Sequence, residues 1–124
     1  GSRLEGLSKI YGVAIVASES CRSAAPHFLW QELDRVRVKG KDTAVHIFTP
    51  RSPASDLSDE LQCWERCLHA WRRQDWQACG EELRHLSRNW PQCALYSLYA
   101  ERLESARLRP FDPAWDGATD FETK

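Results

Sequence analysis

The spacing of hydrophobic residues changes near residue 55, and this change constrains the fold more than any other feature of the sequence. Before it, Val36 and Val38 alternate with arginines, at the period of two that is typical of a strand. After it, apolar residues recur about every three and a half positions, as on one face of a helix. Residues 50–58 are rich in proline and serine, which is typical of a linker. We therefore predict an α+β part, a linker at 51–57 and a helical part.

The first part contains short elements of both kinds. Apolar residues at helical spacing predict a helix over 4–11, ended by Gly12, which tolerates a positive φ. The β-branched run Val13–Ala17 predicts a buried strand. A second helix is expected over 20–25, because Pro26 disfavours helical geometry in the residue before it.

Two further strand patterns, 28–38 and 43–48, flank a short polar loop and predict a β-hairpin. Cations stand at alternate positions along it: Arg35, Arg37, Lys39 and Lys41. A nucleic-acid groove could use such a face. However, no aromatic residues interleave with the cations, and the net charge is −1, with 17 Lys and Arg against 18 Asp and Glu. We therefore expect no nucleic-acid partner.

The second part, residues 58–109, is predicted to form three antiparallel helices on short turns. Their apolar stripes are Leu57, Leu61, Trp64, Leu68 and Trp71; then Trp76, Cys79, Leu83, Leu86 and Trp90; then Leu95, Leu98, Tyr99, Leu103 and Ala106. Asp75 is placed to cap the second helix, and Pro91 is expected at the start of the third, where its missing N–H costs nothing. Pro110 ends the third helix, and the tail at 110–124 either folds back onto the helices or frays.

The five cysteines are an odd number in a chain rich in core-type residues, which favours a reducing compartment over a disulfide framework. A zinc site can be composed from members of one set: Cys63, Cys67, His69, Cys79 and His85. Structural zinc usually uses closely spaced pairs on short knuckles, whereas these cysteines fall within amphipathic helices. We therefore favour small core residues over metal ligands, and we predict no metal site in this chain.

Two stretches of the first part resemble class III adenylate/guanylate cyclases. The sequence RLEGLSK at 3–9, followed by YG at 11–12 and a strand, is similar to the end of the signature helix of that family. Residues 32–41 followed by 45–48 look like the last hairpin of its catalytic domain. The resemblance implies that residues 1–50 are the C-terminal remnant of such a domain, and the absence of methionine also suggests a piece of a longer protein.

This resemblance implies roles for three residues. Arg3 falls on the arginine that stabilises the transition state, where a guanidinium offers paired donors to phosphate oxygens. Lys41, or Lys39, falls on the loop that brings a lysine to the phosphates of the nucleotide. In the intact enzyme the family converts ATP to cyclic AMP and pyrophosphate with Mg²⁺ or Mn²⁺, at a site shared by two subunits of a homodimer. The family's metal-binding aspartates would precede residue 1, so we expect this chain alone to be inactive.

The second part resembles a tetratricopeptide repeat. Residues 71–76, followed by Cys79, Leu83 and Pro91, are similar to the turn and second helix of such a repeat, although its usual turn glycine is absent. A similar helical tail, closing on a Trp-Asp-Gly like 115–117, occurs in bacterial cyclases with an extracellular sensor domain. That likeness implies the cytoplasmic face of an inner-membrane protein. The alternative is a protein-interaction module, in which the helical part binds a protein partner.

Overall fold

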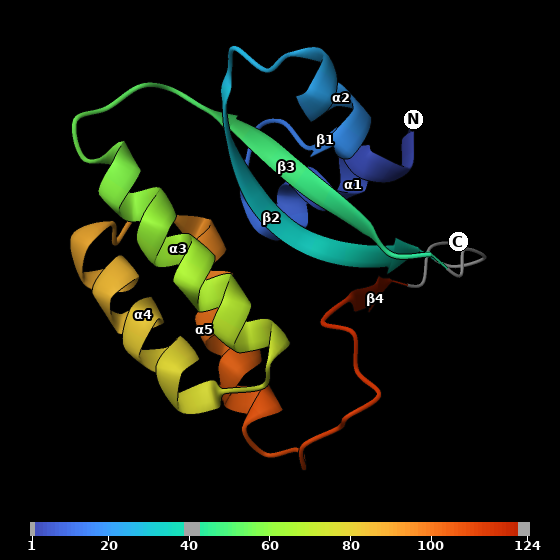
Figure 1. Ribbon diagram of the computed structural model, residues 1–124, viewed down its shortest axis with the longest axis vertical. Helices are drawn as coiled ribbons and strands as arrows, with labels where there is room; N and C mark the ends of the chain where they lie inside the picture. The colour runs from blue at the N-terminus through green and yellow to red at the C-terminus, as the bar shows by residue number, and fades with distance from the viewer. Residues whose placement is uncertain (1, 39–42, 122–124) are drawn as a thin grey trace. The chain divides into compact units, whose positions relative to one another are not determined.

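The computed structural model describes residues 2–38 and 43–121 and divides into two compact units (Figure 1). The first unit consists of Gly1–Pro53 together with Ala118–Lys124, and it contains a four-stranded sheet. The second unit, Ala54–Gly117, contains three long helices. The predicted α+β class, with a partial sheet followed by a helical bundle, is confirmed.

Helix α1 (Ser2–Tyr11) ends where the sequence predicts. Gly12 has a φ of 70°, and the N–H of Val13 donates to the carbonyl of Ser8 at 3.0 Å. This is the hydrogen bond of a Schellman motif, which needs a left-handed residue after the last helical turn. Glycine supplies that conformation without a steric penalty.

The predicted strand at Val13–Ala17 is wrong in its extent, because β1 is only Ala17–Ser18. These two residues pair with Phe48 and Ile47, whereas Ile15 is 55% exposed. A β-branched run becomes a strand only where a neighbouring strand accepts its hydrogen bonds. The second predicted helix is confirmed as α2 (Glu19–Ala24), one residue earlier than predicted, and the Oγ of Ser18 accepts from the N–H of Cys21.

The predicted hairpin is confirmed as β2 (Leu29–Val38) and β3 (Val45–Arg51), which pair antiparallel. Its connection at 39–42 lies outside the described residues. A β-bulge at Leu33 shifts the register between the pairs Glu32–Phe48 and Asp34–Ile47. Because of the bulge, the adjacent residues Leu33 and Asp34 are both buried.

The strand β3 also continues through Pro50 into the predicted linker. A proline cannot donate a ladder hydrogen bond. It is tolerated here because β1, the neighbour on the other side of β3, pairs no further than Phe48.

A fourth strand, β4 (Thr119–Phe121), was not predicted. It pairs parallel with β2, with Thr119 opposite Val36, so that the strand order is β1-β3-β2-β4. The helical unit is therefore an insertion between two strands of one sheet. For the C-terminal segment, folding back onto the helices and fraying were the two predicted alternatives. Trp115 follows the first of them, because its ring centroid lies 5.8 Å from that of Trp71 in α3.

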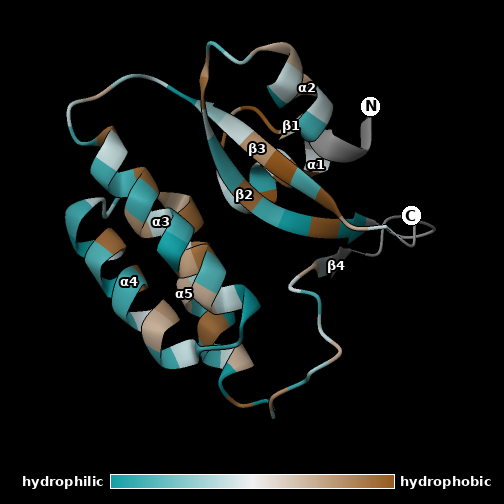
Figure 2. Cartoon of the chain, in the orientation of Figure 1, coloured by the Kyte–Doolittle hydropathy of each residue, from teal (hydrophilic) through white to brown (hydrophobic). Residues whose placement is uncertain are grey.

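The helical unit consists of α3 (Leu57–Arg72), α4 (Trp76–Asn89) and α5 (Ala94–Ala106), which confirms the three predicted helices. Hydrophobic residues recur along each of them among hydrophilic ones (Figure 2). The core is aromatic: the ring centroid of Trp64 lies 4.9 Å from that of Tyr99 and 5.2 Å from that of Tyr96. Pro91 was predicted to open α5 but lies in the turn before it, and Cys93 is the N-cap.

The turn between α3 and α4 contains a left-handed residue that is not glycine. Gln74 has a φ of 60°, and the N–H of Asp75 donates to the carbonyl of Ala70 at 2.9 Å, as in the Schellman motif after α1. Asp75 then caps α4, since its Oδ1 accepts from the N–H of Ala78. The predicted role of Asp75 is confirmed.

The core of the sheet unit contains a carboxylate. Asp34 has no exposed surface, and its Oδ2 accepts hydrogen bonds from the Tyr11 hydroxyl of α1 and from the Thr119 hydroxyl of β4, the latter at 2.8 Å. Its Oδ1 accepts from the N–H of Arg35 at 2.7 Å. Burial of a carboxylate is costly unless donors surround it, so these bonds are required for the unit to fold as it does.

The substitution Tyr11→Phe removes one of these donors without changing the shape of the ring. We expect it to lower the free energy of unfolding of the sheet unit by about 1–3 kcal/mol, because a buried charged acceptor loses a partner. Urea denaturation followed by circular dichroism measures the change. Asp34→Asn and the double variant complete a thermodynamic cycle, and strict additivity of the two changes would contradict a direct interaction.

Candidate functional site

The three predicted phosphate-binding residues belong to two segments of the sheet unit. Arg3 lies in the first turn of α1, and its side chain is outside what the structure describes. Lys39 and Lys41 lie in the β2–β3 connection, outside the described residues. What the structure does bring together is the other end of α1 and strand β2, through the Tyr11–Asp34 hydrogen bond.

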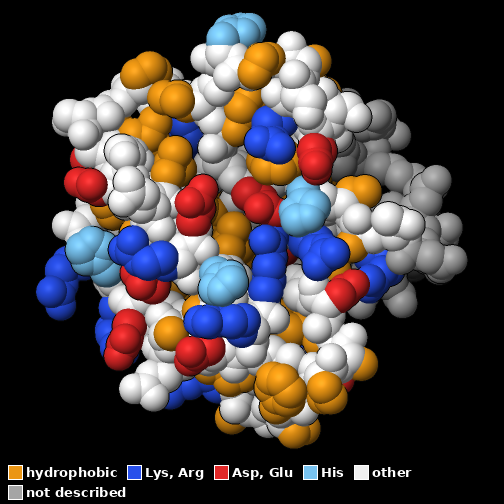
Figure 3. Space-filling model, viewed as in Figure 1, with side chains coloured by type: hydrophobic (Ala, Val, Ile, Leu, Met, Phe, Trp, Pro, Cys, Tyr) orange, Lys and Arg blue, Asp and Glu red, His pale blue; other side chains and the backbone are white. Residues whose placement is uncertain are grey.

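Polar side chains of the hairpin are engaged in pairs across its two strands. The Nδ1 of His46 is in contact with the Oε2 of Glu32, and the Arg51 guanidinium donates to the Oε1 of Gln31 at 2.7 Å. On the face shown in Figure 3, acidic and basic side chains are interspersed. Interspersed charges differ from the single-signed stripe that nucleic-acid grooves present.

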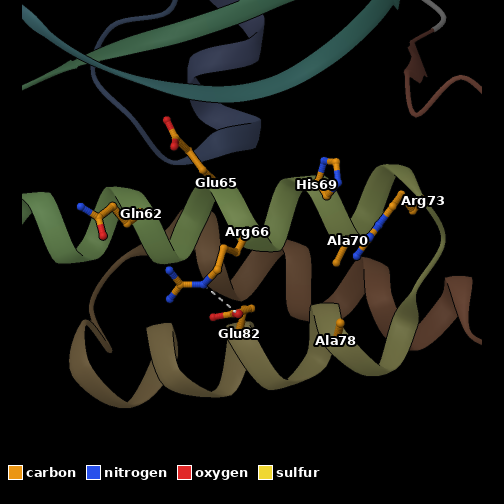
Figure 4. Close-up of a pocket in the computed structure, with 8 residues that line it drawn as sticks. All are labelled: Gln62, Glu65, Arg66, His69, Ala70, Arg73, Ala78 and Glu82. Atoms are coloured by element: carbon orange, nitrogen blue, oxygen red, sulfur yellow. Dashed lines mark hydrogen bonds and ion pairs between the residues drawn. The ribbon is translucent and has the colours of Figure 1, made fainter.

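The helical unit contains a groove of about 560 Å³ between α3 and α4. Figure 4 shows the side chains that line it: Gln62, Glu65, Arg66, His69, Ala70, Arg73, Ala78 and Glu82. Glu65 and His69 point away from α4, whereas Arg66 points toward it and meets Glu82. Ala70 and Ala78 are small, which leaves room between the two helices.

An ion pair bridges the groove. The Nε of Arg66 lies 3.1 Å from the Oε2 of Glu82, and the thiol of Cys63 donates to the Oε1 of the same carboxylate at 3.1 Å. Desolvation raises the pKa of Glu82, but the hydrogen bonds from Arg66 and Cys63 outweigh it and leave that pKa below its usual value. The hydrogen bond to Glu82 in turn raises the pKa of Arg66.

Sequence reasoning did not single out Arg66 or Glu82. Charged residues are common on amphipathic helices, so a single arginine or glutamate does not indicate a site. A signal did exist in their spacing, since they are equally far along the chain from Gln74 at the turn. In an antiparallel helix pair, such residues come to lie opposite each other.

The cysteines of α3 and α4 are buried between the helices. The sulfurs of Cys67 and Cys79 are 3.8 Å apart, and Cys63 is also buried. Desolvation by burial, together with the neighbouring Glu82, raises the pKa of Cys63 to about 12. Within residues 2–38 and 43–121, no group of three or more His, Cys, Asp or Glu is arranged to hold a metal ion. These thiols pack as small core residues.

None of the helices in the described part of the chain combines the length and the apolar character needed to span a bilayer. Comparison of the chain with protein-family models, with curated proteins and with solved structures finds no match.

Thiol labelling tests this description of the cysteines. At pH 8 we expect Ellman's reagent to react first with Cys21, which is exposed, and to leave Cys63, Cys67 and Cys79 protected. For Cys63 the raised pKa adds to the protection that burial gives, because only the thiolate reacts. In urea all five thiols should react at similar rates. Labelling of Cys63 as fast as Cys21 in the folded chain would contradict its burial.

Proposed function

We propose that this chain is the C-terminal part of a class III adenylate cyclase, in which it contributes cationic groups to a site that converts ATP to cyclic AMP and pyrophosphate. The observation that carries the proposal is the Tyr11–Asp34 hydrogen bond. It joins α1, whose first turn contains Arg3, to β2, whose last residue, Val38, precedes Lys39 in the sequence. The order of elements, from α1 through β1 and α2 to the hairpin, also agrees with the order in which the resemblance to cyclases runs.

In this proposal Arg3 stabilises the charge that builds on phosphate oxygens as the ribose 3′-hydroxyl attacks. Lys41, or Lys39, binds the phosphates as a mobile point charge. The described residues offer no carboxylate cluster for Mg²⁺ or Mn²⁺, so the metal ligands would come from outside this chain, and we derive no step through the metal. A second subunit would complete the site, at the cytoplasmic face of a bacterial inner membrane.

The exposed apolar residues of the sheet unit also support the proposal. Ile15, Phe28, Leu29 and Val45 are all exposed. Apolar side chains of a sheet are normally covered, and a larger catalytic domain would supply the missing neighbours.

The test is an ATP cyclisation assay with Mn²⁺ on this chain and on the longer protein that contains it. We expect no cyclic AMP from the chain alone. In the longer protein, Arg3→Ala should lower kcat by about 100-fold, because it removes an interaction made mainly in the transition state. Lys9→Ala, an exposed cation of the same helix, is the matched control. A kcat unchanged by Arg3→Ala would overturn the assignment.

A second function, a tetratricopeptide-like protein-interaction module, is favoured by the turn between α3 and α4. Gln74 adopts the left-handed conformation that the turn glycine of such repeats would adopt. Helices α4 and α5 also approach closely, since a Cβ at Gly80 would lie 3.4 Å from Leu103. The groove between α3 and α4 then provides a charged surface for a partner.

To test the second function, the full chain would be used to capture proteins from a lysate of its source organism. If the groove binds a partner, Arg73→Glu should abolish capture of a protein identified by mass spectrometry. Arg109→Glu, an exposed arginine outside the groove, is the matched control and should retain it. Equal capture by both variants would argue against the groove.

A further inference from the structure

Residues 112–117, which follow α5 within the helical unit, lie against the turn between α3 and α4. The side chains that receive this segment belong to the two helices and their turn: Trp71, Gln74 and Trp76. The residues that lead to it from α5 contribute little, since Leu108 and Phe111 are 87% and 67% exposed. The segment is therefore held chiefly by its own contacts.

One side chain recognises the backbone of the segment. The amide of Gln74 donates to the carbonyl of Asp112 at 2.6 Å and accepts from its N–H at 2.9 Å. A primary amide offers a donor and an acceptor side by side, which matches the two polar groups of one residue's main chain. These bonds fix the register of the segment and make no direct demand on the aspartate side chain.

The ring of Trp115 is the anchor of the segment. Its centroid lies 5.8 Å from that of Trp71 and 6.1 Å from that of Trp76, and those two rings are 5.2 Å apart. Rings in tilted and edge-to-face contact gain more than their buried area alone provides. Two residues later Gly117 has a φ of 83°, and a Cβ there would lie 2.7 Å from the Cγ of Arg72, so only glycine fits.

The turn within the segment is formed by its own hydrogen bonds. The Oδ1 of Asp112 accepts from the N–H of Ala114 at 2.9 Å, and the carbonyl of Asp112 accepts from the N–H of Trp115 at 3.2 Å. The ring of Pro113 fixes φ between them. None of these bonds needs the helices, so a free peptide of the same sequence can form the same turn at a low entropic cost.

We propose that the α3–α4 turn is a peptide-recognition site whose ligand is an Asp-Pro-x-Trp-x-Gly turn. The chain's own residues 112–117 occupy this site and compete with a second polypeptide that carries the same turn. Their covalent link gives them a high effective concentration, on the order of millimolar, so a partner must supply further contacts to displace them. The exposed side chains of Leu108 and Phe111 are available for such contacts. This inference depends neither on cyclase activity nor on the groove between α3 and α4.

Fluorescence anisotropy tests the site with the full chain and a labelled peptide of residues 110–117. Trp115→Ala in the chain removes the anchor of the competing segment and leaves the receiving side chains intact. We expect this variant to bind the peptide at least about tenfold more tightly than the wild-type chain does. Adding Gln74→Gly removes both bonds to the peptide backbone and suits the left-handed conformation there, so binding should weaken about tenfold.

Two variant peptides are the matched controls. The Trp115→Ala peptide lacks the anchor and should not bind. The Phe111→Ala peptide should bind as well as the parent, because Phe111 is 67% exposed beside the docked segment.

Circular dichroism checks that each variant chain keeps its helices. If Trp115→Ala loses them, Pro113→Gly takes its place, because it loosens the turn and retains the anchoring ring. It too should bind the peptide more tightly than the wild-type chain.

Equal binding by the wild-type chain and a folded variant with a weakened segment would overturn the site, and so would binding by neither. Undiminished binding of the Trp115→Ala peptide would also contradict it. No cyclase assay and no groove residue enters these measurements, so the site and the proposed functions stand or fall separately.

Discussion

The sheet unit depends on the buried carboxylate of Asp34. Its donors come from the end of α1, from the next residue of its own strand and from a strand near the far end of the chain. An apolar side chain in that place would tolerate many arrangements of its neighbours. A buried carboxylate tolerates few, because each missing donor leaves part of the charge without compensation. The carboxylate therefore selects one arrangement of α1, β2 and β4.

The helical unit is stabilised differently. Its core is a set of aromatic rings in tilted and edge-to-face contact, built around Trp64, Trp71, Tyr96 and Tyr99. It contains one buried carboxylate of its own, Glu60, which accepts from the hydroxyl of Tyr96 at 2.5 Å. Large rings bury much area per residue, which suits a unit of only three helices. In both units a tyrosine hydroxyl donates a hydrogen bond to the buried carboxyl group.

Much of this fold could be predicted from local pattern. Helices α1, α3, α4 and α5 follow from apolar periodicity and the hairpin from alternation, because those signals depend only on which face is buried. The extent of β1 could not be predicted, since pairing depends on a distant partner, and β4 is too short to show any pattern. The burial of Asp34 could not be predicted, because aspartate usually occupies a surface position.

The candidate site was predictable only in part. Arg3, Lys39 and Lys41 come from a family resemblance, and composition or periodicity would not have selected them. The groove pair Arg66 and Glu82 required the pairing of α3 with α4 and the position of the turn between them. The contact between Thr119 and Asp34 joins residues separated by most of the chain, and no local rule reaches across that interval.

The insertion of the helical unit between β3 and β4 has a consequence for the order of folding. While residues 54–117 are disordered, the docking of β4 must close a long loop, and the entropic cost of closure opposes it. Once the helices have formed, residues 54–117 are no longer a flexible loop, and most of that entropic cost has already been met. Helices form through local contacts and therefore early, whereas β4 pairs with β2 across a long sequence interval. We therefore expect the first and last segments of the sheet unit to join late, with the helical unit already folded between them.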